Sequence, residues 1–225
     1  MSLRVLTWNL FHGRALPPRD EDLLDRFATR LSAWSWDVAL LQEVPPWWPA
    51  SLARACDAEE RRALTSRNAL LPLRQRVATR RPELLKANGG GANAILVRGF
   101  GGIRVHARRR LCVWPERRVV HAVRVGDGQW FANVHASTHA PRARRDVATG
   151  HAAALRWAAG APLVFGGDFN VARIALPGFV HAGASHVDHV FARGYESAAR
   201  AETLARGDLS DHAPLFVTLK RLSRA

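Results

Sequence analysis

Residues 163–170 read Leu-Val-Phe-Gly-Gly-Asp-Phe-Asn, and this stretch does most to predict the fold. Its apolar start predicts a buried strand, and the two glycines that follow allow a ligand to approach the backbone closely. Side chains alternate along an extended chain, so Asp168 and Asn170 point to one side while Phe169 points back into the core. Because ligands of α/β folds gather beyond the carboxyl ends of strands, the stretch predicts both a core strand and one wall of a site.

Three other apolar runs end in polar side chains in the same way, and the residues that follow them include Asn9, Glu43 and His135. Contact with water explains a single polar strand end. Four such ends, which together carry amide, carboxylate and imidazole groups, favour one shared pocket. We therefore expect Asn9, Glu43, His135 and Asp168 to converge.

Two acidic residues near histidines in the last part of the chain extend this pattern. Asp188 lies in an apolar run, residues 187–191, where an ionised carboxylate is costly unless it is paired. Asp211 and His212 lie in a turn that precedes the last predicted strand. A carboxylate beside an imidazole fixes its tautomer and stabilises its charged form, so we expect Asp188 to pair with His212.

The rest of the pattern predicts a single domain over residues 1–225, since no repeat or long linker interrupts it. Apolar residues at helical spacing predict helices at residues 20–34, 49–63 and 142–159. Apolar or alternating runs predict strands at residues 3–8, 37–41, 94–98, 103–113, 118–125, 129–134, 162–165, 187–191 and 214–219. Strands and helices interleave, but the middle of the chain holds consecutive strands with glycine turns, which favours α/β with mixed or antiparallel sheets.

The chain of 225 residues carries 33 Lys and Arg against 19 Asp and Glu, a formal net charge of +14. Its hydrophobic content of 48% excludes disorder of the bulk of the chain. No run approaches the ~20 apolar residues that a membrane helix needs. The positive charge attracts anions of any kind. Because nearly all the basic residues are arginine, a coding bias is an alternative cause of this composition.

The cysteines and the N-terminus bear on the compartment. Cys56 and Cys112 are too few to form a disulfide framework. The N-terminal residues run at once into an apolar strand pattern, without the segments of a signal peptide. The expected localisation is cytoplasmic.

The residue types at the expected site favour a hard divalent cation. Asn9, Glu43 and Asp211 offer oxygen ligands, which suit Mg²⁺ or Mn²⁺ rather than a soft-ligand metal. Zinc is the competing metal, and two histidine pairs could supply its ligands: His135 with His139, or His186 with His189. Neither pair has a credible full ligand set, so zinc is disfavoured.

In chain order, the motifs at these positions resemble those of the endonuclease/exonuclease/phosphatase superfamily, which deoxyribonuclease I typifies. The motifs are Thr7-Trp8-Asn9, Gln42-Glu43, Gly91-Ala92-Asn93-Ala94-Ile95-Leu96, Asn133-Val134-His135, Gly166-Gly167-Asp168-Phe169-Asn170, Val187-Asp188-His189-Val190 and Ser210-Asp211-His212. Each motif alone is weak, but the ordered set covers essentially the whole chain. The resemblance implies a four-layer α/β sandwich, in which two mixed β-sheets pack face to face and are flanked by helices. It also implies Mg²⁺-dependent phosphoester cleavage, with Mn²⁺ as a substitute ion.

The same resemblance implies a role for each oxygen-bearing residue of the site. Asn9 and Glu43 correspond to the metal shell, and Asp211 to a further acidic contact near the metal. Asp168 corresponds to the residue that orients or deprotonates the attacking water, and Asn170 to the amide that holds the phosphate. The implied reaction is an in-line attack of water on phosphorus.

Two histidines complete the implied set. His212, oriented by Asp188, corresponds to the histidine that contacts the phosphate and takes part in proton transfer. His135 corresponds to the second histidine of the deoxyribonuclease-like and lipid-phosphodiesterase branches.

Departures from the family pattern narrow the branch. Abasic-site endonucleases tend to carry Tyr in place of His135 and Asp in place of Phe11, so that branch is disfavoured. Sphingomyelinases usually add a membrane-engaging apolar hairpin, and no exposed apolar hairpin is expected in this chain.

Three functions therefore stay open. The first is a nuclease acting on DNA or RNA, and the second is a phosphodiesterase or phosphatase acting on a lipid head group or a small phosphorylated metabolite. The third is a non-catalytic binding module. Arginine clusters lie at residues 74–81, 104–110, 117–118 and 142–145. The cluster at residues 142–145 follows His135 closely, so it either contacts a phosphate backbone or forms a solvated helical face. Trp47 and Trp48 either stack on bases or, the favoured interpretation, pack in the core.

Overall fold

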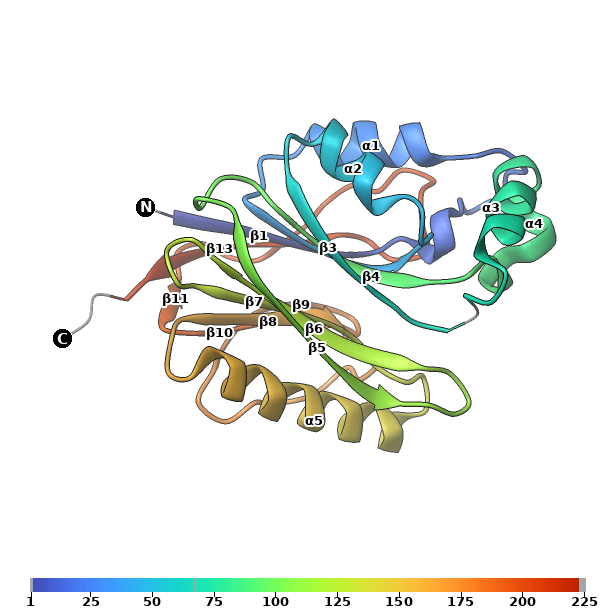
Figure 1. Ribbon diagram of the computed structural model, residues 1–225. Helices are drawn as coiled ribbons and strands as arrows, with labels where there is room; N and C mark the ends of the chain where they lie inside the picture. The colour runs from blue at the N-terminus through green and yellow to red at the C-terminus, as the bar shows by residue number, and fades with distance from the viewer. Residues whose placement is uncertain (1, 67, 223–225) are drawn as a thin grey trace.

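Two β-sheets form the centre of the molecule (Figure 1). The structure is a computed structural model that describes residues 2–66 and 68–222. The first sheet has seven strands in the order β11-β13-β1-β2-β4-β3, with β12 beside β13. Its strands are β1 (Ser2–Asn9), β2 (Val38–Val44), β3 (Glu59–Leu64), β4 (Ala92–Val97), β11 (Tyr195–Ser197), β12 (Glu202–Thr203) and β13 (Leu215–Arg221). Only β1 and β2 pair in parallel, so the sheet is mixed.

The second sheet has six strands in the order β5-β6-β7-β8-β10-β9. Its strands are β5 (Ile103–Cys112), β6 (Arg118–Val125), β7 (Trp130–His135), β8 (Leu163–Asp168), β9 (Val180–Ser185) and β10 (Asp188–Arg193). This sheet is also mixed, because β7 and β8 pair in parallel and the other pairs are antiparallel.

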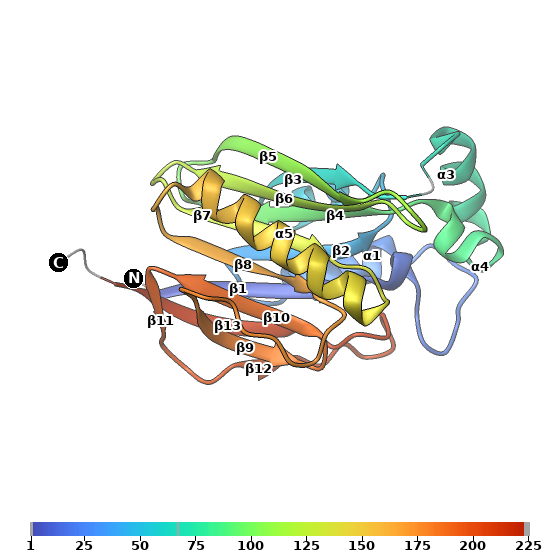
Figure 2. The same ribbon diagram turned by 90° about the horizontal axis from the view of Figure 1, so that it is seen from below.

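Helices cover the outer faces of both sheets (Figures 1 and 2). The helices α1 (Leu24–Ser32) and α2 (Pro49–Ala55) lie on the first sheet, and α5 (Ala140–Ala158) lies across the second. The short elements η1 (Phe11–Gly13), α3 (Leu71–Arg80), α4 (Pro82–Leu85) and η2 (Lys86–Gly89) gather at the end of the molecule opposite the two termini. The four-layer α/β sandwich that the family resemblance implies is therefore confirmed. None of the helices in the described ranges is both long and apolar enough to cross a membrane.

Alternation along the strands distributes the apolar side chains among three layers. Trp8 packs on Phe27 of α1, with ring centroids 5.1 Å apart, on the outer face of the first sheet. Leu40 and Val164 are fully buried between the two sheets. Phe165, the next residue after Val164, points to the opposite face and lies beneath α5. Full burial of each such side chain contributes about 1.5–3 kcal/mol, so the layers hold the sheets and helices in place.

The helix predicted at residues 49–63 is wrong in its second half. The helix α2 ends at Ala55, Asp57 takes a positive φ of 50°, and the chain then forms the edge strand β3. The strand is stabilised by antiparallel pairing with β4, which lies more than 25 residues further along the chain. Local apolar spacing does not report that partner. The strands β9, β11 and β12 were not predicted either, because they too are held by partners that local spacing does not report. The helices α3 and α4 were also not predicted, and α3 buries no side chain that would give it an apolar face.

Amide side chains join the two sheets near the ends of β2 and β7. Gln42 Nε2 donates to Asn133 Oδ1 at 2.8 Å, and both side chains are fully buried. Asn133 Nδ2 donates in turn to the carbonyl oxygens of Leu41 and Ala94 at 2.8 and 2.9 Å. Buried amides must be hydrogen-bonded to avoid a large desolvation cost, so these bonds fix the position of β7 against the first sheet.

We expect the substitution Gly167→Ala to destabilise the fold strongly. Gly167 has φ +133°, and a Cβ there would lie 2.0 Å from the carbonyl oxygen of Val134 in the neighbouring strand. The backbone of β8 would have to move away from β7, at a cost of at least about 2 kcal/mol in the free energy of unfolding. Chemical denaturation measures this loss.

Gly160→Ala is the matched control. Gly160 also has a positive φ, +90°, but no atom lies within 4 Å of the added Cβ. Backbone strain alone should then cost about 1–2 kcal/mol. Equal losses for the two variants would contradict the close-approach explanation.

Candidate active site

Strand register brings the candidate residues to one end of the sandwich. In the parallel pair β1–β2, Asn9 lies opposite Gln42, directly before Glu43. In the second sheet, His135 of β7 and Asp188 of β10 both lie opposite Asp168 of β8. The polar strand ends that the sequence identified therefore do converge.

Asp168 is the centre of the cluster. Its carboxyl group is nearly fully buried and accepts hydrogen bonds from Asn9 Nδ2 at 3.0 Å and from the backbone N–H of Asn170 at 2.9 Å. Burial and the nearby carboxylate of Asp188 raise the pKa of Asp168 to about 7. The group therefore changes protonation near neutral pH, as a general base or acid requires.

His212 and Asp188 form the pair expected from the sequence. His212 Nδ1 lies 2.7 Å from Asp188 Oδ2. Burial opposes the charged imidazolium of His212, but the hydrogen bond to Asp188 and the charges of Asp188, Asp168 and Asp211 outweigh it and raise its pKa to about 9. His212 is therefore a cation at neutral pH, with Nε2–H available to a substrate.

Ser210 and Trp8 hold the turn that carries His212. Ser210 has a positive φ of 64°, its Oγ donates to the carbonyl oxygen of Asn9 at 2.6 Å, and the His212 N–H donates to the same Oγ at 3.0 Å. Trp8 Nε1 donates to the carbonyl oxygen of His212 at 2.9 Å. The turn is thus tied to the carboxyl end of β1, and this positioning role of Ser210 and Trp8 was not predicted.

His135 has the opposite electrostatic character from His212. Its Nε2 lies 3.4 Å from Asp168 Oδ2 and 3.7 Å from Glu43 Oε1. Burial and the guanidinium of Arg118 hold its pKa well below the usual range, so the ring is neutral. Arg118 Nη1 lies 2.9 Å from His135 Nδ1 and 3.1 Å from Nε2. Because a guanidinium only donates and carboxylate oxygens face Nε2, the arrangement favours Nδ1 as the acceptor and Nε2 as the protonated nitrogen.

Glu43 is flanked by a second imidazole that the sequence interpretation missed. Glu43 has a positive φ of 50°, which interrupts the regular alternation of side chains along β2. Its Oε2 lies 3.1 Å from His12 Nε2, and His12 Nδ1 lies 3.2 Å from the carbonyl oxygen of Gly90. His12 follows the strand-end residue Asn9 by three positions, which is the only sequence signal for it. Arg118 is the first residue of β6, and nothing in the sequence around it indicated that it would lie at the site.

The two remaining predicted residues lie at the periphery of the cluster. Asn170 has a positive φ of 51°, and its Nδ2 donates to the carbonyl oxygen of Ala136 at 3.0 Å. The Asp211 side chain is 40% exposed, with Oδ1 at 4.0 Å from His212 Nε2. Asp211 is therefore close to His212, whereas no contact with Asn9 or Glu43 is found in the described parts of the chain.

The cluster fits a hard divalent cation. Side-chain atoms of Asp168, Asp188 and His212 all lie within 4.8 Å of one another. Because His212 is an imidazolium, the carboxylate oxygens and not its ring nitrogens are the available ligands in this group. Asp188 Oδ1 is buried and has no hydrogen-bond partner, so an oxygen is free to serve as a ligand. Glu43 adds a carboxylate that faces imidazoles rather than a guanidinium. Carboxylate oxygens next to an amide are the donors that Mg²⁺ and Mn²⁺ prefer.

The zinc alternative is not supported by the surroundings of His189. Its Nε2 lies 2.7 Å from the carbonyl oxygen of Val171, and its Nδ1 lies 3.1 Å from His181 Nε2. Both ring nitrogens are thus engaged in hydrogen bonds, and the ring packs against Phe169. His189 has a structural role in the core.

Exposed apolar side chains lie on two segments close to this end of the molecule. The turn between β5 and β6 exposes Val113 and Trp114 by 64% and 79%, so the expectation that the chain has no exposed apolar hairpin is wrong. The strand predicted at residues 103–113 included Val113, which instead lies in the turn after β5. Exposed leucines on and beside α3 and α4 are Leu70, Leu73 and Leu84. Trp48, in contrast, is buried against Phe27 at 5.4 Å, which confirms core packing for that residue.

Comparisons with known proteins agree with this geometry. A model of the endonuclease/exonuclease/phosphatase family matches residues 6–212. The structure of an endonuclease/exonuclease/phosphatase from Beutenbergia cavernae is similar, with 20% identity, a TM-score of 0.71, and coverage of 98% of this chain and 72% of that one. A family protein from Bacteroides vulgatus has 14% identity and a TM-score of 0.70, over 98% of this chain and 99% of that one.

TDP2 from Caenorhabditis elegans is also similar, with 15% identity and a TM-score of 0.67, over 97% of this chain and 74% of that one. At these identities the structures establish the fold alone. A search of curated protein sequences found no significant match.

We expect the pKa of the His212 imidazole, measured by NMR titration in metal-free buffer, to lie near 9. Asp188→Asn removes the nearest charge that stabilises the imidazolium, so the pKa of His212 should fall clearly, because burial then opposes the charged ring with less compensation. Asp25→Asn, on the exposed face of α1, is the control and should leave the titration unchanged. A pKa that is equal in wild type and Asp188→Asn would contradict the pairing.

Proposed function

We propose, from the premise that this chain belongs to the endonuclease/exonuclease/phosphatase family, that it is a nuclease that hydrolyses phosphodiester bonds of DNA or RNA. Membership of the family makes the chain a metal-dependent phosphoesterase hydrolase. The nucleic-acid substrate, the identity of the ion as Mg²⁺ or Mn²⁺, and the roles of single residues are parts of the proposal.

The proposed ligands of the ion are the oxygens of Glu43 and Asn9, with the carboxylates around Asp168 close by. When bound, a divalent cation there would stabilise negative charge on the phosphate oxygens. Asn9 also donates to Asp168, so it orients the carboxylate whatever its own share in ion binding.

Asp168 is the proposed general base for the attacking water. Its carboxylate is fixed by Asn9 and by the backbone of Asn170, so its lone pairs have a defined direction. The proton of the water passes to a carboxylate oxygen of Asp168 as the water oxygen bonds to phosphorus. A pKa near 7 is matched to this transfer at neutral pH.

His212 is the proposed electrophilic group. Because Nδ1 is engaged with Asp188, its other N–H, at Nε2, can donate to a phosphate oxygen while charge builds up in the transition state. The same N–H can protonate the leaving oxygen. Neutral His135 then offers a hydrogen bond from Nε2 without adding a second positive charge to the site.

The observation that carries the nucleic-acid substrate is the charge around the site. A cavity of about 260 Å³ opens from Glu43 and His135, and its other charged lining residues are Arg14, Arg117, Arg118 and Glu116. The formal net charge of +14 has the same sign. Guanidinium groups contact phosphates on either side of a scissile bond well, so a polynucleotide fits this cavity.

A lipid head group is the second candidate substrate. The exposed side chains of Trp114, Leu70 and Leu84 lie on segments that adjoin the cavity, and apolar side chains among arginines are typical of proteins that bind a membrane surface. This candidate retains the same catalytic residues.

We expect Mg²⁺-dependent cleavage of plasmid DNA, single-stranded DNA or RNA, measured beside a chromogenic phosphodiester and inositol phosphates. Asp168→Asn should lower kcat about 10²- to 10⁴-fold, because it removes the proton acceptor. Chelation by EDTA should abolish cleavage, and added Mg²⁺ or Mn²⁺ should restore it. Asp127→Asn, in a turn at the other end of β6, is the control. Full activity of Asp168→Asn on every substrate would contradict the role of Asp168 as the general base.

Ionic strength should separate the two candidate substrates. Affinity for a nucleic acid falls steeply with salt, with a slope of log K on log salt of about −0.7 per phosphate contact for single strands. We therefore expect KM for single-stranded DNA or RNA to rise steeply between low and physiological salt, while KM for the chromogenic phosphodiester changes little. Hydrolysis confined to lipid vesicles would favour the lipid head group instead.

A further inference from the structure

A groove between the edge strands of the two sheets is the strongest feature that the proposed reaction does not use. The strand β3 is the edge of the first sheet and β5 the edge of the second, and they lie side by side in two views (Figures 1 and 2). The groove has a volume of about 600 Å³. Its lining residues are Arg62, Ala63, Leu64, Arg108, Arg110, Arg117 and Val119.

All the ionisable side chains in this lining are arginines. The side chains of Arg62, Arg108 and Arg110 are exposed, and within residues 2–66 and 68–222 no carboxylate forms an ion pair with them. Like charges gathered in one groove repel one another and are stabilised by an anion between them. The charge pattern therefore fits an extended anionic ligand.

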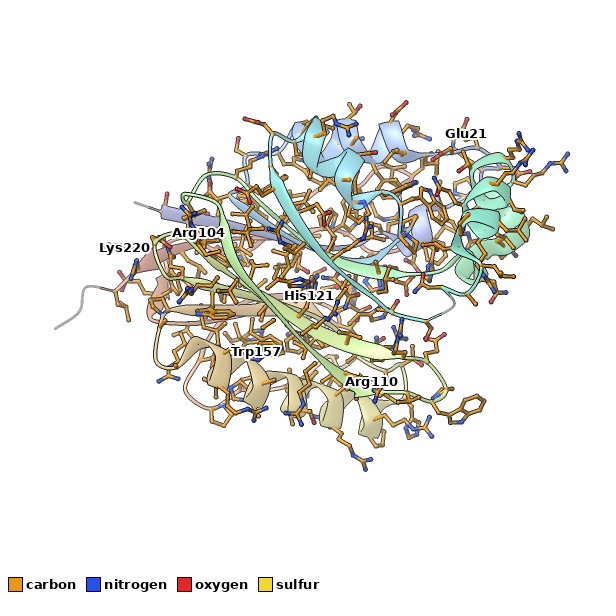
Figure 3. All side chains as sticks on the ribbon, viewed as in Figure 1. Glu21, Arg104, Arg110, His121, Trp157 and Lys220 are labelled. Carbon is orange, nitrogen blue, oxygen red and sulfur yellow. The ribbon has the colours of Figure 1, made fainter. Side chains whose placement is uncertain are left out.

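The groove leads directly to the site. Arg117 lines both the groove and the cavity that contains Glu43 and His135. Its guanidinium donates to the carbonyl oxygen of Thr65 at the end of β3, so it holds the two sheet edges together at this point. Figure 3 shows Arg110 toward the end of the molecule that carries α3 and α4, and Arg104 at the opposite end of β5.

The spacing of the arginines suits a polymer. Arg108 and Arg110 are two residues apart on β5 and point to the same side, which separates them by about 7 Å along the strand. That distance is comparable with the separation of successive phosphates in an extended single strand. A flat bilayer would contact the rim of the groove rather than its floor, so the groove favours a single-stranded nucleic acid over a membrane.

An exposed aromatic side chain in the turn next to the groove favours a single-stranded nucleic acid. Trp114 is 79% exposed in the turn between Arg110 and Arg117, the two arginines that line the groove on either side of that turn. A basic groove combined with an exposed aromatic ring is how proteins bind single strands without sequence preference, since every base can stack. A stacked duplex does not offer its bases in this way.

We propose that this groove, which we call the edge groove, binds the flank of a single-stranded nucleic acid whose scissile phosphate lies in the candidate active site. The inference rests on the proposed nuclease function and adds the path of the strand. Arg117 lies at the junction, Arg62, Arg108 and Arg110 contact successive phosphates, and the ring of Trp114 stacks on a base.

The test compares two variants that remove the same charge. The groove variant is Arg62→Gln/Arg108→Gln/Arg110→Gln. The control variant is Arg30→Gln/Arg156→Gln/Arg200→Gln, which changes exposed arginines on α1, on α5 and in the loop after β11. The probe is a fluorescent phosphorothioate oligothymidylate of twelve nucleotides in Mg²⁺, with affinity measured by anisotropy over a range of salt concentrations. Denaturation curves and hydrolysis of a chromogenic phosphodiester check that each variant is folded and active.

We expect the groove variant to bind the oligonucleotide at least about tenfold more weakly than wild type, with the salt slope reduced by about 2, the value for three lost phosphate contacts. The control variant should keep nearly the whole affinity, and both should hydrolyse the small phosphodiester within about twofold of wild type. Trp114→Ala should weaken oligonucleotide binding without changing the salt slope.

Three results would overturn the edge groove: equal affinity of the groove and control variants, tighter binding of a duplex than of the single strand, or binding of anionic phospholipid vesicles without binding of the oligonucleotide. The nuclease proposal can fail separately. If the strand binds with the expected dependence on the groove but an unmodified strand is not cleaved, the edge groove stands and the nuclease function does not.

Discussion

The hydrogen bond between Gln42 and Asn133 is the contact on which the geometry of the site depends. It joins the two sheets in the buried layer between them, one residue before Glu43 and two before His135. Buried amides tolerate few alternative positions, because a displaced donor or acceptor loses its partner without gaining water. The sheets therefore pack in one register at this end, and Asn9 of the first sheet reaches Asp168 of the second at 3.0 Å. Two layers held by apolar contacts alone would have no comparable means to fix the distance between a carboxylate and an imidazole.

Two histidines of the same cluster are held in opposite charge states, and the difference explains how the site can work on a phosphoester. His212 gains a carboxylate partner and remains an imidazolium, whereas His135 faces the guanidinium of Arg118 and remains neutral. Asp168, buried beside Asp188, exchanges its proton close to neutral pH. One fixed positive charge, one neutral imidazole and one proton acceptor thus surround the same space. Pairs of groups whose pKa values are driven apart by their surroundings are typical of acid–base catalysis.

The sequence predicted the site better than it predicted the elements around it, for a physical reason. The residues Asn9, Asp168 and Asp188 follow or occupy apolar strands, so their side of the sheet could be derived from alternation alone. The strand β3 and the helix α3 could not be derived in this way, because one is held by a distant partner and the other buries no side chain. His12 reaches the site through a turn in which it has a positive φ, and Arg118 reaches it from the start of β6. No apolar spacing in the sequence around either residue indicates this position. The edge groove joins residues of β3 and β5, which are paired with different sheets and become neighbours only when the sheets pack.

We have proposed that oxygens of Glu43 and Asn9 hold a divalent cation beside Asp168, at the point where the phosphoester reacts. Anomalous diffraction from crystals grown with Mn²⁺ tests it most directly, because the method locates the ion without reference to activity. We expect an anomalous peak at coordinating distance from a carboxylate oxygen of Glu43 and from Asn9 Oδ1. A peak confined to other residues, with Glu43 and Asn9 unliganded, would contradict this assignment.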